Sequence, residues 1–418
     1  MERKKILLLK FPNLNNYGTG MMGLVAMQQI SNRLGAENVE FISDFNSYAN
    51  FNEIKSELKG PFVINSDYDK KHQNKIVNNS SYFSRIINYI NNFICGEYIK
   101  GVDLIVVLGG DCFTEERSTI VYKDLIRLWL FSFKVKVVMV GQTMGPFNNW
   151  KNRLSCRYLL PRIDIFARDS WCYNYLQNEF SLKNKLHLSA DLAMADLPLE
   201  NNQEIKRNIL NTYNLNSKGY ISFVISGIQT EGFYCNSREQ YVSNWKNIIE
   251  HVASIDALLT KKIVLLAHTF KPYGEEDEFV KNMFNELSSD LQSRTVVVSE
   301  RILQTRARLI LGNGLFTITG RMHAAVSTFQ MGTPAISLAY SPKYNGVIGN
   351  GLKRSDLIIY ANDNQLWATG DIVCKVTEKV NYLLDNYDHI ISDIKPAIES
   401  QKELLMKSLD LICQDLKK

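Results

Sequence analysis

The sequence predicts an α/β protein with two Rossmann-like domains, each built around a parallel sheet. Three observations carry this prediction. Short apolar runs alternate with helical patterns over most of the 418 residues, which is the order that β-α-β units require. The length suits two domains of ordinary size. A polar stretch, Glu200–Lys218, divides the apolar runs into two series. We therefore expect domains at residues 1–200 and 201–390, followed by an amphipathic helix at residues 391–418.

The first series of apolar runs predicts the sheet of the N-terminal domain. These runs are short and end in polar or glycine residues, as buried parallel strands do. The expected strands are Lys5–Lys10, Val39–Ile42, Val102–Leu108, Val135–Val140, Ile163–Ala167 and Leu186–Ser189. A helix is expected from about Met21 to Leu34, where Gly35 suits a C-terminal cap.

The second series predicts the sheet of the C-terminal domain in the same way. Its expected strands are Tyr220–Ile225, Ile263–His268, Thr295–Val298, Leu315–Thr319, Pro334–Ala339 and Leu357–Tyr360. Helical patterns separate the strands, and the clearest are Ser237–Thr260, Glu275–Leu287 and Arg301–Leu311.

Composition and charge exclude several classes of protein. Hydrophobic residues make up 45% of the chain and charged residues 22%, which is globular usage and not that of a disordered, collagen-like or coiled-coil chain. The formal net charge of +5 is too small over this length to indicate nucleic-acid binding. It suits an anionic substrate or a weak association with a membrane surface, and the charge alone leaves both open.

Cysteine usage and apolar run lengths predict a cytoplasmic protein without a bound metal. The seven cysteines are odd in number and form no C-x-x-C pair, so neither a disulfide framework nor a zinc cluster is expected. The apolar run at residues 6–9 is too short for a signal peptide, and no run reaches the ~18 residues of a membrane span. The inner face of the membrane is the alternative location. Asp67-Tyr68-Asp69 resembles a metal-holding D-x-D pattern, but a solvated turn explains it better.

Polar and glycine residues follow the expected strands, at the edge where parallel sheets hold their ligands. With two such domains, the active site is expected in the cleft between them. The segments at these strand ends are Asn15–Gly18, Gly109–Asp111, Gly141–Pro146, Arg168–Ser170, Asp191, Ser226–Gly227, His268–Thr269 and Gly320–His323. Of these, Asn16, Tyr17, Gly18, Gln142 and His268 are candidate substrate contacts.

Gly18-Thr19-Gly20-Met21-Met22-Gly23 matches the dinucleotide fingerprint G-x-G-x-x-G. The loop at residues 12–17 is too long for the tight turn that the fingerprint needs. We therefore expect no dinucleotide cofactor. A glycine-rich loop that opens a helix can still offer N–H groups to an anion.

Two further strand ends carry charged candidates. Gly110 and Asp111 follow a buried run, where Asp111 either caps the next helix or acts as a carboxylate on a sugar hydroxyl. Arg168 ends another buried run, and a cap does not explain its long cationic side chain. We expect Arg168 to bind an anion.

The strongest local signal is Gly320-Arg321-Met322-His323, which joins an expected strand to a helix. Arg321 and His323 fall in the first turn, beside the unpaired N–H groups and the positive end of the helix dipole. That arrangement predicts an anion site, and the dipole also eases proton donation by His323. Lys343, beyond the next strand, brings another cation to the same edge.

Together these segments resemble the polysaccharide pyruvyl transferase family. The likeness rests on an ordered set: Asn15–Gly20, Gly109–Asp111, Gly141–Pro146, Arg168-Asp169, Ser189–Ala193, Gly320–Ala324, Gly332–Pro334 and Lys343. It spans roughly residues 5 to 350. There are two departures: Met322 stands where the family often has Leu, a volume-conserving exchange, and Thr19 follows Gly18 where the family often has Asp.

The resemblance implies a GT-B-like fold whose last helix often returns to the first domain. It also implies transfer of a pyruvyl group from phosphoenolpyruvate, as co-substrate, to two hydroxyls of a glycan or lipid-linked saccharide, forming a cyclic ketal. Arg168, Arg321 and the helix start at Met322 would hold the donor. His323 would act as the acid, and Asp111 or His323 as the base. Tyr17 would stack on the acceptor sugar.

Two alternatives remain open from the sequence. The same architecture serves GT-B glycosyltransferases, whose nucleotide-sugar diphosphate would sit at the start of the helix with Arg321 and His323. A non-catalytic glycan-binding relative is the third reading, and the intact Arg/His pair disfavours it. The acceptor sugar and the oligomeric state cannot be read from these residues.

Overall fold

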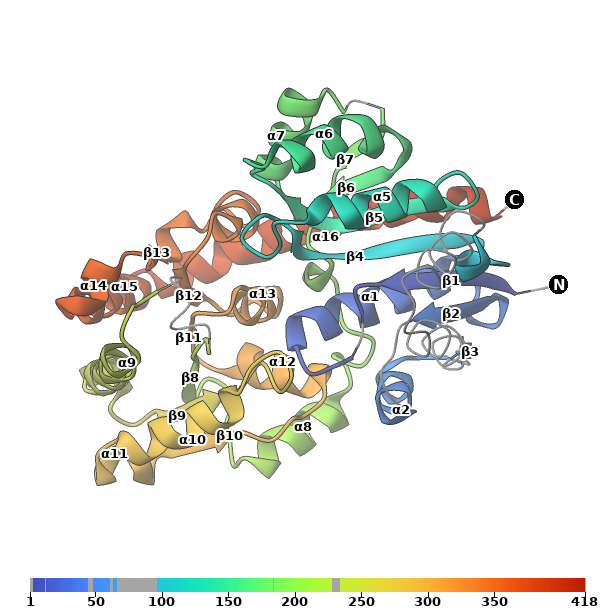
Figure 1. Cartoon of the computed structure of the whole chain (residues 1–418). Helices are drawn as coiled ribbons and strands as arrows, with labels where there is room; N and C mark the ends of the chain where they lie inside the picture. Colours follow the sequence, from blue (N-terminus) through green and yellow to red (C-terminus); the bar gives the residue numbers. More distant parts are fainter. Residues whose placement is uncertain are drawn as a thin grey trace, which may run out of the picture. The chain divides into compact units, whose positions relative to one another are not determined.

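The computed structural model describes residues 3–11, 13–43, 48–60, 63–65, 96–182, 184–227 and 234–417. The chain divides into two compact units. Unit 1 comprises Met1–Leu14, Thr19–Leu192 and Gln401–Lys418, and unit 2 comprises Asn15–Gly18 and Ala193–Ser400 (Figure 1). The D-x-D pattern at Asp67–Asp69 lies outside the described residues.

The described part of unit 1 is built on a seven-stranded sheet with the order β3-β2-β1-β4-β5-β6-β7, in which the paired strands are parallel. The strands are β1 Lys4–Leu9, β2 Val39–Ser43, β3 Val63–Asn65, β4 Leu104–Phe113, β5 Lys136–Met144, β6 Asp164–Ala167 and β7 Leu186–Leu188. The helices are α1 Tyr17–Leu34, α2 Tyr48–Glu57, α5 Val121–Phe131, α6 Trp150–Leu159 and α7 Ser170–Phe180. Gly35 follows α1 with a φ of 85° and donates its N–H to Ser31, which confirms the expected cap.

β4 continues past Leu108, where the sequence predicts that the strand ends. Gly109, Gly110 and Asp111 belong to the strand, and its register with β5 shifts between Gly110 and Phe113. Gly109 is needed because β5 packs against it: a Cβ there would lie 2.6 Å from the carbonyl carbon of Gly141. The predicted end of the strand at Leu108 is therefore wrong, since the two backbones themselves make the close approach that glycine permits.

The described part of unit 2 holds a six-stranded parallel sheet with the order β10-β9-β8-β11-β12-β13. The strands are β8 Tyr220–Val224, β9 Lys262–Leu266, β10 Thr295–Val298, β11 Thr317–Thr319, β12 Ala335–Ala339 and β13 Ile358–Tyr360. The chain builds outward from β8 to β10 and then crosses back to β11. This reversal makes the β8–β11 pair the topological switch point, where open parallel sheets hold their ligands.

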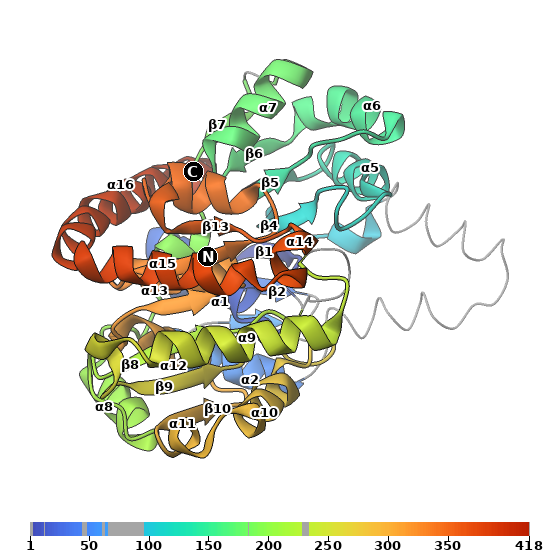
Figure 2. The ribbon, with the colours of Figure 1, turned by 90° about the vertical axis from the view of Figure 1, so that its left-hand side faces the viewer.

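Helices cover both faces of the sheet in unit 2. They are α8 Gln203–Thr212, α9 Arg238–Ala253, α10 Glu276–Glu286, α11 Ser289–Ser293, α12 Gln304–Asn313, α13 Met322–Gln330, α14 Asn364–Ala368, α15 Asp371–Asp385 and the first part of α16 Tyr387–Gln414. α9 and α15 lie side by side on one face (Figure 2), and α12 packs against α13 on the other. None of the described helices combines the length and apolar character that a membrane-spanning helix needs.

A buried arginine ties residues 193–200 to unit 2. Arg308 of α12 donates to the carbonyl oxygens of Ala193 and Ala195 and to the carboxylate of Glu200, at 2.8–3.0 Å. Its side chain is fully buried, so these partners are needed to offset its lost hydration. This cluster accounts for the division of the chain between Leu192 and Ala193, ahead of the polar stretch where the sequence places the boundary.

Candidate functional site

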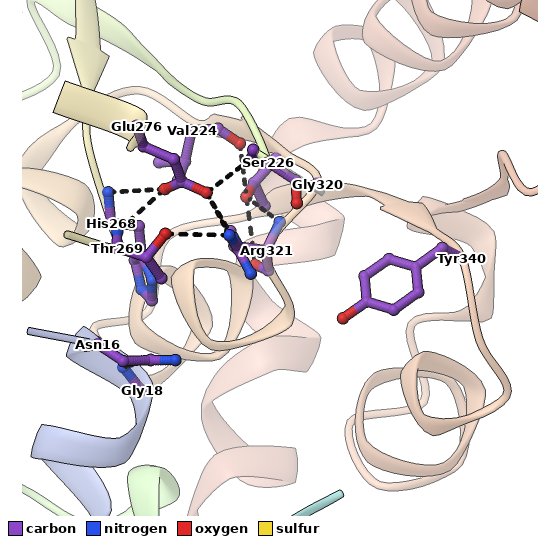
Figure 3. Close-up of polar contacts among 12 residues, drawn as sticks. Asn16, Gly18, Val224, Ser226, His268, Thr269, Glu276, Gly320, Arg321 and Tyr340 are labelled. Carbon is purple, nitrogen blue, oxygen red and sulfur yellow. Dashed lines mark hydrogen bonds and ion pairs between the residues drawn. The ribbon is translucent and has the colours of Figure 1, made fainter. Parts of the chain in front are cut away.

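Three loops converge at the carboxyl edge of the sheet in unit 2 (Figure 3). Ser226 follows β8, His268 and Thr269 follow β9, and Gly320 and Arg321 follow β11. Because the three strands are parallel neighbours, their ends meet at one edge of the sheet. Residues that lie far apart in the sequence are therefore brought together at the switch point.

Arg321 is the central cation of this group. It is the N-cap residue of α13, with an extended backbone, and its N–H is accepted by the hydroxyl of Thr319 at 2.8 Å. Its guanidinium donates from Nε to Glu276 at 2.6 Å and from Nη2 to Thr269 at 3.0 Å. Among the described residues, Nη1 has no hydrogen-bond partner. Burial by itself lowers the pKa of Arg321, but the Glu276 carboxylate outweighs it and the pKa is raised. The side chain stays charged and fixed in direction.

Glu276 holds Arg321 in place, and sequence reasoning missed it. This first residue of α10 has a side chain that is 0% exposed. Besides Arg321, its carboxylate accepts the backbone N–H groups of Gly227, His268 and Thr269, at 2.8–3.0 Å. In the sequence it stands among acidic neighbours, and such a run is typical of the solvated first turn of a helix. Only the tertiary structure shows that Glu276, unlike its acidic neighbours, is buried against Arg321.

The Asn15–Gly18 loop pairs with the loop after β9. Asn16 forms an antiparallel bridge with Thr269, and the N–H of Tyr17 donates to the carbonyl of His268 at 3.2 Å. The Asn16 side chain accepts the N–H of Gly18 at 3.0 Å and so caps α1. The loop therefore belongs to unit 2, at the edge where Arg321 lies.

His323 occupies the first turn of α13 and packs against Gly18. A Cβ at Gly18 would lie 2.6 Å from the Cγ of His323, so a side chain at this position would push the imidazole away. The close approach explains why glycine stands here, where the sequence offered a dinucleotide motif or an anion loop. The acid role predicted for His323 stays a prediction, since geometry alone does not test it.

His268 lies beside these groups with its ring packed against Tyr17. The two ring centroids are 5.4 Å apart in an edge-on arrangement, and His268 is 2% exposed. Burial, and then the charges of Arg321 and His323, lower its pKa well below the ordinary value of histidine. The imidazole is therefore neutral at physiological pH.

Tyr17 does not fit the sugar-stacking role expected from the sequence. Its side chain is 0% exposed, its ring contacts His268 and Phe270, and its hydroxyl accepts the N–H of Ile302 at 3.0 Å. Burial raises its pKa far above the usual range. A ring enclosed by protein on these sides has no open face for a sugar, so Tyr17 acts as a support beneath His268.

Tyrosines and Lys343 surround the turn that precedes Arg321. The hydroxyls of Tyr234 and Tyr344 donate to the carbonyl of Gly320 at 2.8 and 2.6 Å. Lys343 is 9% exposed and its Nζ donates to the hydroxyl of Tyr340 at 2.7 Å. Lys343 thus lies in unit 2 near the same turn. Met322, the other predicted contact here, has a buried side chain. Any contact of Met322 with a substrate would therefore be made by its backbone N–H at the helix start.

Arg168 lies in a buried polar cluster of unit 1. It donates from Nη1 to Asp191 and from Nε to Thr143, at 2.8 and 2.7 Å, and its side chain is 1% exposed. Burial by itself lowers the pKa of Arg168, while the carboxylates of Asp191, Asp169 and Asp111 raise it above the usual value. The geometry is that of a structural ion pair, and the predicted anion contact stays a prediction.

The remaining predicted residues of unit 1 lie at the ends of β4 and β5. Asp111 accepts from Arg117 at 3.2 Å and its side chain is 20% exposed. It does not cap a helix, because it is part of β4. Gln142 is fully buried and its amide donates to the carbonyls of Val107 and Leu108, so it braces β4. Gly110 has a φ of 129° and open space where a Cβ would lie.

The structure thus groups the predicted residues within each unit separately. Unit 2 brings together Asn16, Tyr17, Gly18, His268, Arg321, Met322, His323 and Lys343, and unit 1 holds Gly110, Asp111, Gln142 and Arg168. Within the described ranges, no three His, Cys, Asp or Glu side chains are grouped as metal ligands. Whether the protein needs a metal or cofactor stays a matter of prediction.

Comparison with known proteins identifies relatives and fold. A model of the family described as polysaccharide pyruvyl transferase matches residues 16–342, a range that includes the Arg321–His323 segment. The amylovoran biosynthesis protein AmsJ of Erwinia amylovora is 22% identical over 337 residues, which cover 78% of this chain and 76% of that protein.

Solved structures with the same fold include a UDP-GlcNAc 2-epimerase and the MnaA protein with UDP. The Neisseria meningitidis UDP-GlcNAc 2-epimerase bound to UDP-GlcNAc has a TM-score of 0.61 at 11% identity, covering 99% of this chain and 100% of that one. The S. aureus MnaA–UDP structure has a TM-score of 0.57 at 14% identity, covering 94% and 91%. Identities this low show the fold alone. They confirm the predicted two-domain, Rossmann-like and GT-B-like class.

Proposed function

Because the chain belongs to the polysaccharide pyruvyl transferase family, we propose that its pyruvyl donor is phosphoenolpyruvate and that its product is a cyclic ketal. The acceptor is a sugar of a bacterial surface polysaccharide or of its lipid-linked precursor. The relative named for amylovoran biosynthesis supports a biosynthetic role. The observation that carries the proposal is the fixed guanidinium of Arg321 at the start of α13. Its Nη1 makes no hydrogen bond to the described residues.

Phosphoenolpyruvate carries a phosphate and a carboxylate, and the switch point of unit 2 offers groups that suit both. Nη1 of Arg321 has no partner among the described residues, and α13 begins at Met322, so the positive end of its helix dipole lies next to Arg321. Lys343 supplies a second cation near the same turn. Charge-assisted hydrogen bonds of this kind are the stronger ones.

Glu276 makes Arg321 a prepared donor. The carboxylate and Thr269 hold two of the guanidinium nitrogens, so the side chain loses little further freedom when an anion binds. Ordering a flexible side chain at the moment of binding costs affinity, and a fixed one avoids that cost. The ion pair also accounts for a buried arginine in the absence of ligand.

The reaction needs one proton donor and two proton acceptors. His323 donates a proton to C3 of phosphoenolpyruvate, which leaves an oxocarbenium-like C2. One sugar hydroxyl attacks C2 and loses its proton, the C2–O bond to phosphate breaks, and the second hydroxyl closes the ring with loss of its own proton. Two protons are released and one is used at C3, so the departing phosphate carries the other. His323, once deprotonated, is one base for these steps, and Asp111 is the other candidate.

His323→Ala tests the assignment of the acid. General acid catalysis contributes about 10²–10⁴-fold, so kcat should fall by at least about 100-fold. Phosphate release and mass spectrometry with phosphoenolpyruvate and p-nitrophenyl glycosides of glucose, galactose and mannose would measure it. His389→Ala is the matched control, since its side chain is 74% exposed on α16 and it should keep wild-type turnover.

The donor is tested by binding. Thermal stabilisation of the wild-type protein by phosphoenolpyruvate, with none by UDP-GlcNAc, is the expected result. Stabilisation by the nucleotide-sugar alone would replace this proposal with a glycosyltransferase. Full turnover in His323→Ala would leave the donor in place and remove His323 from the acid role.

A further inference from the structure

The backbone of His268 is held by two hydrogen bonds, whereas its ring makes none to any residue that the structure describes. Its backbone N–H donates to Glu276 at 3.0 Å, and its carbonyl accepts from Tyr17 at 3.2 Å. The side chain is buried, and within the described part of the chain neither Nδ1 nor Nε2 has a hydrogen-bond partner. Figure 3 shows the ring extending from the strand end toward Asn16 and Gly18.

A purely structural role does not explain this ring. Buried polar groups in proteins are almost always hydrogen-bonded, because leaving one unsatisfied is costly. An apolar side chain of similar size could pack against Tyr17 as well and would avoid that cost. Buried polar groups without a partner occur characteristically at sites of binding and catalysis. The two buried nitrogens of His268 thus lack a partner among the described residues, and a molecule bound at this strand end would supply one.

We propose that His268 contacts the substrate directly and that its imidazole hydrogen-bonds to a hydroxyl group of the acceptor sugar. The inference rests on the proposed function, because the acceptor is defined by it. His268 would then contact the acceptor sugar, while Arg321 and the start of α13 bind phosphoenolpyruvate.

The choice of a hydroxyl follows from the chemistry of the neutral ring. One nitrogen of a neutral imidazole donates and the other accepts. Phosphate and carboxylate oxygens only accept, so they are better served by Nη1 of Arg321 and by the helix N–H groups. A sugar hydroxyl both donates and accepts, which matches the ring. The charged and titratable groups around the ring are Arg321 and His323 from α13, Tyr17 from the start of α1 and Glu276 from α10. Burial first, and then the charge of Arg321, keep the ring neutral.

The test separates acceptor use from donor binding. In His268→Leu, kcat/KM for the best p-nitrophenyl glycoside acceptor should fall by about 30-fold or more, while the Kd of phosphoenolpyruvate, measured calorimetrically without acceptor, should change by less than about threefold. His268→Gln, whose amide both donates and accepts, should recover part of the loss. Thr269→Val is the opposite control: it removes a partner of Arg321 and should weaken donor binding.

Each outcome decides the assignment. Unchanged kcat/KM in His268→Leu would make His268 structural, and loss of phosphoenolpyruvate affinity as large as in Thr269→Val would make it an anion contact. Cooperative thermal unfolding is the check on folding, and His268→Gln carries the comparison if the leucine variant does not fold. If the wild-type protein neither bound phosphoenolpyruvate nor released phosphate, the proposed function itself would be wrong. If the wild-type protein is active and His268→Leu is equally active, only the assignment of His268 is wrong.

Discussion

Two arginines that end parallel strands show how much a single residue depends on its surroundings. Arg168 follows β6 and Arg321 precedes α13, and each pairs with a buried carboxylate, Asp191 or Glu276, at 2.8 or 2.6 Å. Their exposures differ: the side chain of Arg168 is 1% exposed and that of Arg321 is 11% exposed. Arg321 thus lies at a partly exposed edge, whereas Arg168 is buried among the carboxylates of Asp191, Asp169 and Asp111.

Arg168→Ala should therefore unfold more readily. Removing one partner of a buried ion pair leaves the other charged and unpaired, which costs about 3–5 kcal/mol. Urea denaturation should show this loss in the free energy of unfolding. The double change Arg168→Met with Asp191→Asn should recover part of it, because no buried charge is then left alone. If stability were unchanged and only donor binding were lost, Arg168 would be an anion contact after all.

At the scale of elements, the site of unit 2 depends on how the start of α1 meets the start of α13. Gly18 lies in the first turn of α1 and His323 in that of α13. The absence of a side chain at Gly18 lets the imidazole lie against the helix backbone. Alanine is otherwise the better helix residue, by about 0.5–1 kcal/mol, so stability alone does not favour glycine here.

Gly18→Ala should lower kcat by roughly tenfold or more, because small displacements of a catalytic group can cost up to about 100-fold. The fold should survive with a small shift of the two helix starts, since the imidazole can turn away but the Cβ of His323 would lie 2.9 Å from the added methyl group. The sharper measurement is a double-mutant cycle. In the His323→Ala background, Gly18→Ala should cause no further loss of kcat. A full additional loss in that background would mean that Gly18 acts independently of His323.

At the scale of the whole chain, the last residues complete unit 1. Gln401–Lys418 belong to that unit. Arg33 of α1 pairs with Asp410 at 2.7 Å, and Lys136 of β5 pairs with Asp415 at 2.9 Å. The apolar side chains of this segment are also buried: Leu405, Leu409, Ile412 and Cys413. A segment at the end of the sequence thus covers elements formed at its beginning.

A chain that ends at Ser400 should be much less stable or insoluble. Burying a Leu or Ile side chain is worth about 1.5–3 kcal/mol, so losing the three in this segment is comparable with the ~5–15 kcal/mol of a typical domain. Thermal unfolding and solubility would measure the effect. A chain ending at Gln414 is the control: it keeps Leu405, Leu409 and Ile412. It loses the half-buried Leu416 and the Lys136–Asp415 ion pair, which is worth about 0–1 kcal/mol. Equal stability of both truncated chains would contradict this role of the segment.

The order and type of the elements could be predicted because their signals are local. Apolar runs at Ile263–His268 and Tyr220–Ile225 record burial of those residues and match β9 and β8. The end of α1 at Gly35 could also be predicted from a local signal, since a positive φ is a property of one residue. The end of β4 was missed because its continuation depends on Gly141 of a neighbouring strand, which no window around Gly109 contains.

The sequence by itself determined the fold class and the positions of the polar residues at the strand ends, because the burial pattern of a strand or helix is a property of neighbouring residues. Its ordered motifs also carried the resemblance to the family. Only the tertiary structure decided the partners. It joined Arg321 to Glu276, Arg168 to Asp191 and the Asn15–Gly18 loop to His268, and it enclosed Tyr17. These partners are far apart in the sequence, and a buried charge finds its counter-charge only where packing brings the loops together, so no local pattern specifies the pair.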